Sequence, residues 1–393
     1  MRILASGDHH FDQHSHRWSE CLRIHEWMLD EAKRQGADLF VSAGDIYERA
    51  STPIERHEVR QWVTAMANIC PIIIVRGNHD ALLDLRILGG LRAAHPIHVV
   101  EDAQVIRIGD TLVGALAWPS TSLIAAQAEA LGVPADALAE NAMAAVCRGI
   151  GAQFDALEGS EPLYRMLVAH AMVDGSVTSL GQPLIGAEMR IGLDTLALSR
   201  ANTVVLGHIH KAQEWTTRVD DQEVRVLYTG SPFRTAFGET EEKSILSIDT
   251  EAGITRIPTP ATPMLLLEGV ARMGKPSDSV EGAMELVLDG RSTASLERIK
   301  GAEVRLRYTV AASQAGDAKR AASKARDHML ADGALSVKVE AVVDAVTRAR
   351  APEVTKAGTI AEKLEVLWKL RGNAPSDGAR DRIIAKLGSL SHG

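Results

Sequence analysis

Short apolar runs alternate with amphipathic segments along the first part of the chain. The apolar runs occupy residues 1–6, 37–44 and 70–77, and a polar residue or a glycine ends each of them. Residues 20–36 and 54–69, which lie between these runs, space their apolar residues as an amphipathic helix does. This alternation predicts a layered α/β unit whose first strands are mostly parallel. Functional side chains of such a sheet gather at the carboxyl ends of its strands.

More strands are predicted farther along the chain, before a proline-rich stretch at residues 258–263. Residues 121–158, which are rich in Ala, Leu and Glu, predict helix between these strands. Residues 244–258 predict a hairpin, with Glu251, Ala252 and Gly253 at its turn. The other predicted strands are residues 98–109, 111–119, 164–170, 202–208 and 223–231.

The chain beyond residue 260 predicts a smaller α/β part followed by two helices. We expect three parts, at residues 1–260, 261–345 and 346–393. The first of the two terminal helices carries an apolar stripe at helical spacing, formed by Ile360, Leu364, Leu367 and Trp368. The elements predicted here are a helix around residues 277–290, strands at 302–310 and 335–343, and helices at 315–330, 358–372 and 377–390.

Composition indicates a soluble globular protein. Hydrophobic residues make up 46% of the 393 residues and charged residues 24%, which excludes disordered and fibrous classes. No apolar run approaches the roughly 20 residues that span a bilayer, and residues 1–7 lead into a strand rather than a signal peptide. We therefore expect a cytoplasmic protein without a membrane partner. Cys21, Cys70 and Cys147 are too widely spaced for a disulfide framework or a zinc knot, so we expect buried small side chains.

Charge is unevenly distributed along the chain. The formal net charge is -8, but residues 295–393 contain 18 Lys and Arg against 12 Asp and Glu. The last quarter of the chain is therefore basic, and the preceding residues carry a net charge of -14. This asymmetry is expected if acidic side chains gather around metal ions while the basic part faces phosphates.

Five predicted strands end in side chains that bind hard or borderline divalent metals. Each alone has an ordinary explanation, such as a helix cap, a turn or a buried core histidine. Together they would meet at the edge of one sheet, where a mixed set of Asp, Asn and His fits a pair of divalent ions used in phosphoryl chemistry. The groups are Asp8-His9-His10, Gly44-Asp45, Gly77-Asn78-His79-Asp80, His170 and Gly207-His208-Ile209-His210.

The ordered set D-x-H, G-D, G-N-H-D, H and G-H-x-H resembles the calcineurin-like metallophosphoesterases. Within them the chain looks like the SbcD-type nuclease subunits, because residues 191–196 (IGLDTL), 204–213 (VVLGHIHKAQ) and 227–244 (LYTGSPFRTAFGETEEKS) are similar to their segments. This resemblance implies an α/β fold with a layered β-sandwich flanked by helices. It also implies a small α/β capping domain and a C-terminal helical tail.

The resemblance assigns roles residue by residue. It implies two divalent ions, with Mn²⁺ preferred and Mg²⁺ possible. Asp45 would bridge them, and His79 would protonate or stabilise the leaving oxygen, oriented by Asp80. The first ion would be held by Asp8, His10 and His210, and the second by Asn78, His170 and His208. Side chains alternate at a strand end, so we expect His9 to point away from the ions.

The same resemblance implies a DNA nuclease of repair and recombination. It would act from the 3′ side of DNA ends and as an endonuclease on single-stranded or hairpin DNA, as a homodimer, with the tail docked on the coiled coil of an SbcC-like ABC-type ATPase. Lys319, Arg320, Lys324 and Arg326 cluster on one predicted helix, which suits backbone phosphates but is also typical of a solvated face.

Some residues leave alternatives open. Many members of the superfamily have G-D-x-x-D as their second motif. In this chain the last position of that motif is Glu48. Asp12, His14 and His16 fit a surface loop, although a groove lining is the alternative. We expect a substrate-facing loop that contains Tyr228, Ser231 and Arg234, with Arg234 available for a phosphate.

Other functions share this metal centre. The main alternative is a metallophosphoesterase acting on a small phosphodiester or phosphomonoester. A non-catalytic scaffold for the ATPase is disfavoured because every ligand position is filled and His79 is present. The DHH phosphoesterases, suggested by Asp8-His9-His10, need further acids upstream, and only seven residues precede Asp8.

Overall fold

A computed structural model describes residues 1–119, 129, 134–159, 162–179, 190–239, 241–273, 284–288, 296–344, 354, 356–372 and 374–390. The described residues divide into two compact units. The first contains those within 1–268, 290–306 and 325–339, and the second contains those within 269–289, 307–324 and 340–393. The capping and docking roles expected for the parts after residue 260 stay predictions.

Two mixed sheets build the first unit, each with six strands among the described residues. The first sheet has the order β14-β13-β1-β2-β3-β4, in which β1 to β4 are parallel and the β13–β14 hairpin is antiparallel. The predicted hairpin at residues 244–258 is therefore confirmed. The strands of this sheet are β1 (Arg2–Ser6), β2 (Leu39–Ser42), β3 (Ile72–Val75), β4 (Ile97–Val100), β13 (Ser244–Asp249) and β14 (Gly253–Pro258).

The second sheet has the order β11-β12-β10-β7-β6-β5. Its four central strands, β12, β10, β7 and β6, are parallel, and β11 and β5 pair antiparallel at the edges. Its strands are β5 (Ala103–Ile108), β6 (Thr111–Leu116), β7 (Tyr164–His170), β10 (Thr203–Gly207), β11 (Gln213–Val219) and β12 (Gln222–Tyr228). Two short strands, β8 (Met172–Val173) and β9 (Arg190–Ile191), pair separately.

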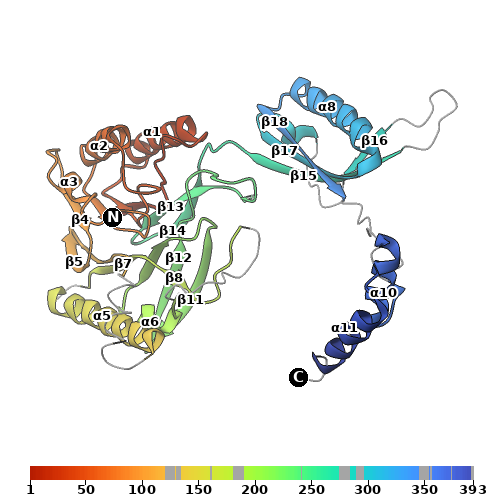
Figure 1. Ribbon diagram of the computed structural model, residues 1–393. Helices are drawn as coiled ribbons and strands as arrows, with labels where there is room; N and C mark the ends of the chain where they lie inside the picture. The colour runs from red at the N-terminus through yellow and green to blue at the C-terminus, as the bar shows by residue number, and fades with distance from the viewer. Residues whose placement is uncertain are drawn as a thin grey trace. The chain divides into compact units, whose positions relative to one another are not determined.

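Helices cover the outer faces of both sheets (Figure 1). Thr52 caps α2 through a capping box with Glu55, and Pro53 occupies the first turn. Gly36 ends α1 in the left-handed conformation. The helices are α1 (Trp18–Gln35), α2 (Pro53–Ala67) and α3 (Arg86–Gly89) beside the first sheet, and α5 (Ala135–Leu157) and α6 (Leu193–Ala197) beside the second. Of the helix predicted over 121–158, residues 121–128 and 130–133 lie outside the described residues.

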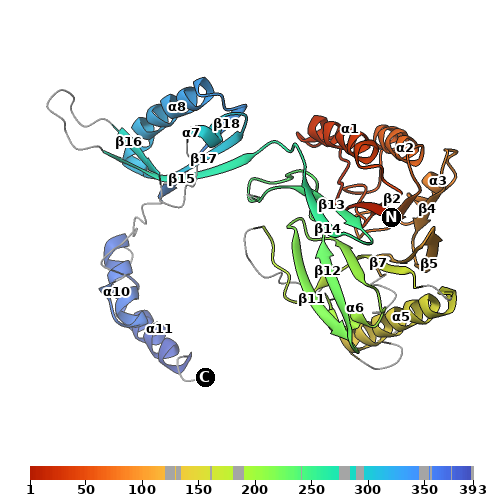
Figure 2. The same cartoon turned by 180° about the vertical axis from the view of Figure 1, so that it is seen from behind.

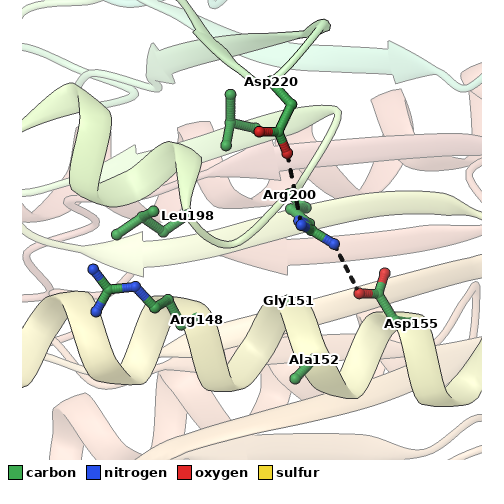
Figure 3. A pocket seen from close by; sticks show the side chains of 8 residues that line it. Arg148, Gly151, Ala152, Asp155, Leu198, Arg200 and Asp220 are labelled. Carbon is green, nitrogen blue, oxygen red and sulfur yellow. Dashed lines mark hydrogen bonds and ion pairs between the residues drawn. The ribbon is translucent and has the colours of Figure 1, made fainter.

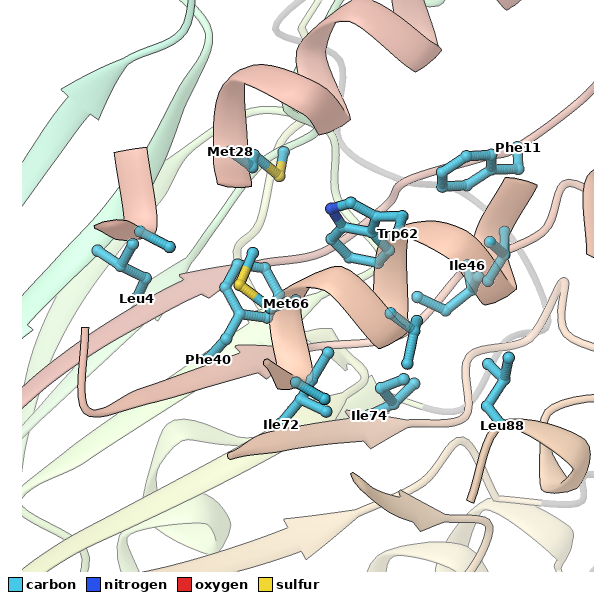
Figure 4. Packing of buried hydrophobic residues seen from close by; sticks show 14 of the residues in the cluster. Leu4, Phe11, Met28, Phe40, Ile46, Trp62, Met66, Ile72, Ile74 and Leu88 are labelled. Atoms are coloured by element: carbon cyan, nitrogen blue, oxygen red, sulfur yellow. The ribbon is translucent and has the colours of Figure 1, made fainter. Parts of the chain in front are cut away.

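A shared core lies between the two sheets. Ile3 and Ala5 of β1 are buried in this core together with Val168 and Val205 of the second sheet. Leu4, between them in sequence, belongs to the cluster on the helix side. Alternate residues of one strand therefore serve two layers. Figure 4 shows the helix-side cluster in which Leu4 packs with side chains of α1 and α2. Complete burial of one such side chain contributes roughly 1.5–3 kcal/mol.

The strand ends do not lie on one sheet, which corrects the sequence prediction. β1, β2 and β3 belong to the first sheet, whereas β7 and β10 belong to the second. The predicted strand at 98–109 is also two strands, because the chain leaves the first sheet after β4 and enters the second at β5. Glu101 and Asp102 form the crossing. The flanking apolar residues fit either sheet, so their pattern gave no signal of the change.

A third sheet follows in the order β16-β15-β17-β18. The predicted helix around 277–290 is wrong over residues 284–288, which form β16 and pair antiparallel with β15. Ala, Met, Glu and Leu favour helix locally, but pairing with a neighbouring strand overrides that preference. The elements are β15 (Met264–Met273), β16 (Met284–Leu288), α7 (Leu296–Ile299), β17 (Glu303–Ala311), a 3₁₀ turn (Ala312–Gln314), α8 (Ala315–Ala331) and β18 (Ser336–Asp344).

The chain ends in two helices, α10 (Ile360–Arg371) and α11 (Asp377–Leu390), as predicted (Figure 2). Thr359 and Glu362 form a capping box at the start of α10, and Gly372 ends it in the left-handed conformation. An ion pair between Arg380 and Glu365 joins the two helices. Across the described part of the chain, we find no helix long and apolar enough to cross a membrane.

Candidate metal centre

The predicted ligands from both sheets meet at one edge of the sandwich. Asn78, which follows β3, places Oδ1 2.8 Å from His170 Nε2 and 2.9 Å from His208 Nδ1, which come from the second sheet. His10, which follows β1, places Nε2 2.9 Å from His210 Nε2. Convergence therefore holds, although the edge is shared by two sheets.

Asp45 lies between the two groups of side chains. Its Oδ2 is 3.4 Å from His170 Nε2 and 3.9 Å from His10 Nε2. Its Oδ1 accepts a hydrogen bond of 2.9 Å from the His79 backbone N–H. A carboxylate that reaches both groups has the position needed for the predicted bridging ligand.

Glycines in the motifs allow the loops to approach this closely. A Cβ atom on Gly77 would lie 2.1 Å from Asp45 Oδ1, and one on Gly207 would lie 2.2 Å from the Ala43 carbonyl oxygen. Gly44 has a φ of +99° and would place a Cβ 2.5 Å from His170 Nδ1. Larger residues would displace the candidate ligands, which explains the glycines in G-D, G-N-H-D and G-H-x-H in physical terms.

The loop after β1 is not an extended strand. β1 ends at Ser6, and Asp8 and His10 have positive φ values of 53° and 44°. Backbone N–H groups of Asp8, His9 and His10 donate to the carbonyl oxygens of Gly44 and Asp45, which holds this uncommon conformation. His9 does point away from the candidate ligands, but a tight left-handed loop, rather than strand alternation, is the reason.

His9 is buried and takes part in a hydrogen-bonded group behind the loop. Its Nδ1 is 2.8 Å from His25 Nε2, and its Nε2 is 3.0 Å from Ser42 Oγ. Burial, followed by repulsion from His25 and His10, holds the pKa of His9 well below its usual value. Burial lowers the pKa of His25 to about 4. Both rings are therefore neutral near pH 7.

Three candidate histidines turn Nδ1 outward and Nε2 toward the site. His170 Nδ1 donates to the Ala43 carbonyl oxygen at 2.7 Å. His10 Nδ1 lies 2.7 Å from Glu48 Oε2, and His210 Nδ1 lies 3.3 Å from Glu239 Oε1. An acceptor at Nδ1 leaves the Nε2 lone pair for a metal ion.

The donor set fits divalent metal ions. Asp8 Oδ2 is buried and has no hydrogen-bond partner among the residues that the structure describes. In their neutral forms the two Nε2 lone pairs of His10 and His210 would face each other at 2.9 Å, an arrangement that a shared cation stabilises. Candidate ligand atoms of Asp8, His10 and His210 all lie within 4.8 Å of one another, as do those of Asp8, Asp45 and His170.

Electrostatics of the metal-free site follow from burial and close charges. Burial opposes the charged form of His170, but the Asp45 and Asp8 carboxylates outweigh it and raise the pKa of His170 to about 9. Burial, together with repulsion from His170, lowers the pKa of His208 to about 3. Although burial favours the neutral carboxyl, His170 and the neighbouring histidines hold the pKa of Asp45 well below its usual range.

Metal binding should therefore release a proton from His170. Its raised pKa means that the charged ring stabilises the metal-free fold below pH about 6.5, a contribution lost as the pH rises through about 9. Because a histidine ligand must be neutral, we expect apparent Mn²⁺ affinity to rise from pH about 7 to about 9. Titration calorimetry in buffers of different ionisation enthalpy would measure the release. An affinity independent of pH would contradict this assignment.

His79 is partly exposed beside the site. Its Nδ1 donates to the Glu48 carbonyl oxygen at 2.7 Å, and its ring lies T-shaped to the His10 ring with 5.1 Å between the centroids. Asp80, expected to orient this ring, is instead buried. Its two oxygens accept hydrogen bonds of 2.9 Å from the backbone N–H groups of Tyr47 and Gly77. Asp80 therefore holds together the loops that contain Tyr47 and Gly77. The Glu48 carbonyl, rather than Asp80, orients the His79 ring.

Glu48 and Glu239 are the residues that sequence reasoning missed. Glu48 contacts His10 through its carboxylate and His79 through its carbonyl oxygen, so it links a candidate ligand to the candidate acid. Glu239 is buried and pairs with both His210 and Lys243. The departure from G-D-x-x-D at position 48 was a usable signal, whereas Glu239 lies in the segment 227–244 that carries the resemblance but in none of the ligand motifs.

The three candidate substrate contacts are enclosed by the fold. Tyr228 Oη donates to the Ala171 carbonyl oxygen and accepts from the Val173 N–H. Ser231 Oγ donates to the Phe233 carbonyl oxygen. Arg234 donates to the carbonyl oxygens of Glu239, Thr262 and Glu241. These bonds support the loop from inside, so the geometry gives Tyr228, Ser231 and Arg234 no open position for a phosphate.

Cavities among the described residues lie both beside the candidate ligands and away from them. One of about 160 Å³ is next to His10 and is lined by Asp12, Glu48, Trp18 and Phe233 among others. Asp12 also pairs with Arg49 at 2.6 Å and accepts from the His14 N–H, so it is a loop residue that lines this cavity as well. Another of about 380 Å³ lies between α5 and the β11–β12 turn, where Arg200 bridges two aspartates (Figure 3). No candidate ligand lines this second cavity.

Comparison with known proteins agrees with this geometry. Residues 1–212 match the family described as Calcineurin-like phosphoesterase. The SbcD subunit of nuclease SbcCD is 26% identical over 298 residues, covering 68% of this chain and 71% of the relative, both in Escherichia coli K12 and in Escherichia coli O157:H7.

Similarity to solved structures is low. A dimetal phosphatase from Danio rerio has a TM-score of 0.43 and 9% identity, covering 66% of this chain and 96% of that chain. A protein of Thermus thermophilus has a TM-score of 0.38 and 14% identity, covering 65% and 98%. The sequence match to the family spans more than half of the chain and includes every candidate ligand. The chain therefore belongs to the calcineurin-like phosphoesterases, a family with a dinuclear metal site, and is a metal-dependent phosphoesterase.

Proposed function

We propose that this chain is a DNA nuclease of the SbcD type. The observation that carries the proposal is the likeness to the SbcD subunit of nuclease SbcCD, which covers 68% of the chain and so extends beyond the family match at residues 1–212. A relative that shared only the metal site with this chain would not need to be similar to it beyond residue 212. The proposed activity is removal of nucleotides from the 3′ side of DNA ends, with endonuclease action on single-stranded and hairpin DNA, in repair and recombination.

The proposed chemistry uses the residues in two groups. Two divalent ions, Mn²⁺ in our proposal and Mg²⁺ as the alternative, would activate water and neutralise charge on the phosphate. Asp8, His10 and His210 would hold one ion, Asn78, His170 and His208 the other, and Asp45 both. With both ring nitrogens protonated, His79 would deliver the Nε2 proton to the leaving oxygen, while its Nδ1–H stays bonded to the Glu48 carbonyl.

The proposed partners follow from the parts after residue 260. On α10, none of the described side chains is buried: of the apolar stripe, Ile360 is exposed and Leu364, Leu367 and Trp368 are half-buried. An apolar stripe that is incompletely buried suits docking on a coiled coil, here that of an SbcC-like ATPase. Lys319, Arg320, Lys324 and Arg326 are exposed on α8 and would contact DNA phosphates. A cytoplasmic homodimer completes the proposal.

Nuclease assays on the purified full chain with Mn²⁺ test the proposal. We expect shortening of linear duplex DNA from its 3′ ends and opening of DNA hairpins, with no activity in EDTA. An Asp45→Asn variant purified in parallel controls for contaminating nucleases. Hydrolysis of p-nitrophenyl phosphate or bis-p-nitrophenyl phosphate, with linear and hairpin DNA left intact, would instead establish the small-substrate alternative.

A further inference from the structure

Three buried polar side chains, His9, His25 and Ser42, form a hydrogen-bonded network directly behind the loop that carries Asp8 and His10. His9, between these two candidate ligands, joins His25 of α1 at 2.8 Å and Ser42 at the end of β2 at 3.0 Å. His25 Nδ1 in turn lies 2.7 Å from the Cys21 carbonyl oxygen. The rings are enclosed by aromatic side chains, with Trp62 packed against both of them.

The Cys21 carbonyl fixes the direction of every hydrogen bond in the network of His9, His25 and Ser42. A carbonyl oxygen can only accept, so His25 carries its proton on Nδ1 and offers a lone pair at Nε2. His9 must then donate from Nδ1, and its Nε2 accepts from the Ser42 hydroxyl. One backbone oxygen thus determines the tautomers of two histidines, and each ring nitrogen of His9 has a single possible role.

This network connects the loops that carry the candidate ligands. The His9 ring reaches Ser42, three residues before Asp45, and the His9 backbone N–H donates to the Asp45 carbonyl oxygen at 2.8 Å. The Cys21 thiol lies 3.8 Å from the His9 carbonyl oxygen, so α1 contacts His9 at both its backbone and its ring. Asp8 and His10 hold positive φ values on either side. An anchored residue between them restrains both side chains at once.

We propose that His9 is a positioning residue for the first metal ion, acting through its paired hydrogen bonds to His25 and Ser42. It binds no metal itself. Its ring fixes the left-handed loop so that Asp8 and His10 present their ligand atoms toward His210, as partners behind metal ligands commonly do. This inference rests on the proposed metal centre.

The alternative is a buried polar group that stabilises the fold without affecting the site. The structural role and the positioning role predict different effects of a His9 substitution on the affinities of the two metal ions. A purely structural role would lower the stability of the whole unit and would affect both metal ions alike. A positioning role weakens the ion held by Asp8 and His10 and spares the ion held by Asn78, His170 and His208.

The experiment is a Mn²⁺ titration of the metal-free full chain by calorimetry, with thermal unfolding measured in parallel. Wild type is expected to bind two ions. His9→Phe keeps an aromatic ring but neither hydrogen bond, and should weaken one binding step by about 10–100-fold while leaving the other unchanged. Ser42→Ala should cause a smaller loss at the same step. His10→Ala identifies that step as the first metal.

Val59→Ala is the matched control, because Val59 is buried in the same core on α2 and contacts no candidate ligand loop through a polar group. It should lower the unfolding temperature without changing either affinity. The inference is overturned if both affinities survive in His9→Phe and Ser42→Ala, or if both steps weaken together. Should His9→Phe not fold, Ser42→Ala decides alone. If wild type binds no Mn²⁺, the metal centre itself is wrong.

Discussion

An Asp45→Asn variant is expected to bind neither metal ion tightly and to turn over substrate at less than about a thousandth of the wild-type rate. Asp45 lies within 3.4 Å of His170 and 3.9 Å of His10, so one carboxylate serves both halves of the site. The amide keeps the shape of the side chain but removes its negative charge. Loss of one preorganised electrostatic group costs roughly 10²–10³-fold in rate, and this substitution also removes the bound ions.

The measurement for Asp45→Asn combines Mn²⁺ stoichiometry with nuclease turnover. Asp110→Asn provides the control, because Asp110 is an exposed aspartate between β5 and β6. It should retain two ions and full activity. An Asp45→Asn protein that still binds two ions with wild-type affinity would show that Asp45 does not bridge them.

A His79→Asn variant is expected to keep both metal ions but to lose about 10²–10⁴-fold in kcat on DNA. His79 contacts Asp45 through its backbone N–H, a bond that asparagine keeps, whereas its ring lies beside the His10 ring, with Nδ1 bonded to the Glu48 carbonyl oxygen. The loss should be much smaller on bis-p-nitrophenyl phosphate, because p-nitrophenolate leaves readily without a proton.

Comparison of the two substrates separates proton transfer from other effects of His79→Asn. His57→Asn serves as the control and should behave as wild type, because His57 is an exposed histidine of α2 that hydrogen-bonds to Gln61. Equal losses of kcat on DNA and on bis-p-nitrophenyl phosphate would mean that His79 does not act as an acid toward the leaving oxygen.

The sequence identified the candidate ligands that the structure brings together, but it did not show the arrangement of sheets that joins them. Asp8, Asp45, Asn78 and His170 each follow an apolar run closely, so their positions at strand ends were visible from local pattern. That these ends belong to two sheets was not visible, because β4 and β5 are separated only by Glu101 and Asp102. Sheet membership depends on pairing between distant strands, which a local pattern does not record.

Residues that support the site were harder to predict than the candidate ligands. His9 was expected to point away from the metal ions, and its ring does so, but its partners His25 and Ser42 lie 16 and 33 residues away in sequence. Arg234 was expected to face a phosphate because it is charged and follows a motif. It is buried and donates to backbone carbonyls instead, a use of arginine that sequence alone does not distinguish.

The central claim is that the edge shared by the two sheets holds two metal ions bridged by Asp45. Anomalous diffraction at the manganese edge, from crystals of the full chain grown with Mn²⁺, tests it most directly. The account predicts two peaks about 3.5–4 Å apart, one beside His10 and His210 and the other beside His170 and His208, with Asp45 in contact with both. A single peak, or two peaks of which only one contacts Asp45, would contradict it.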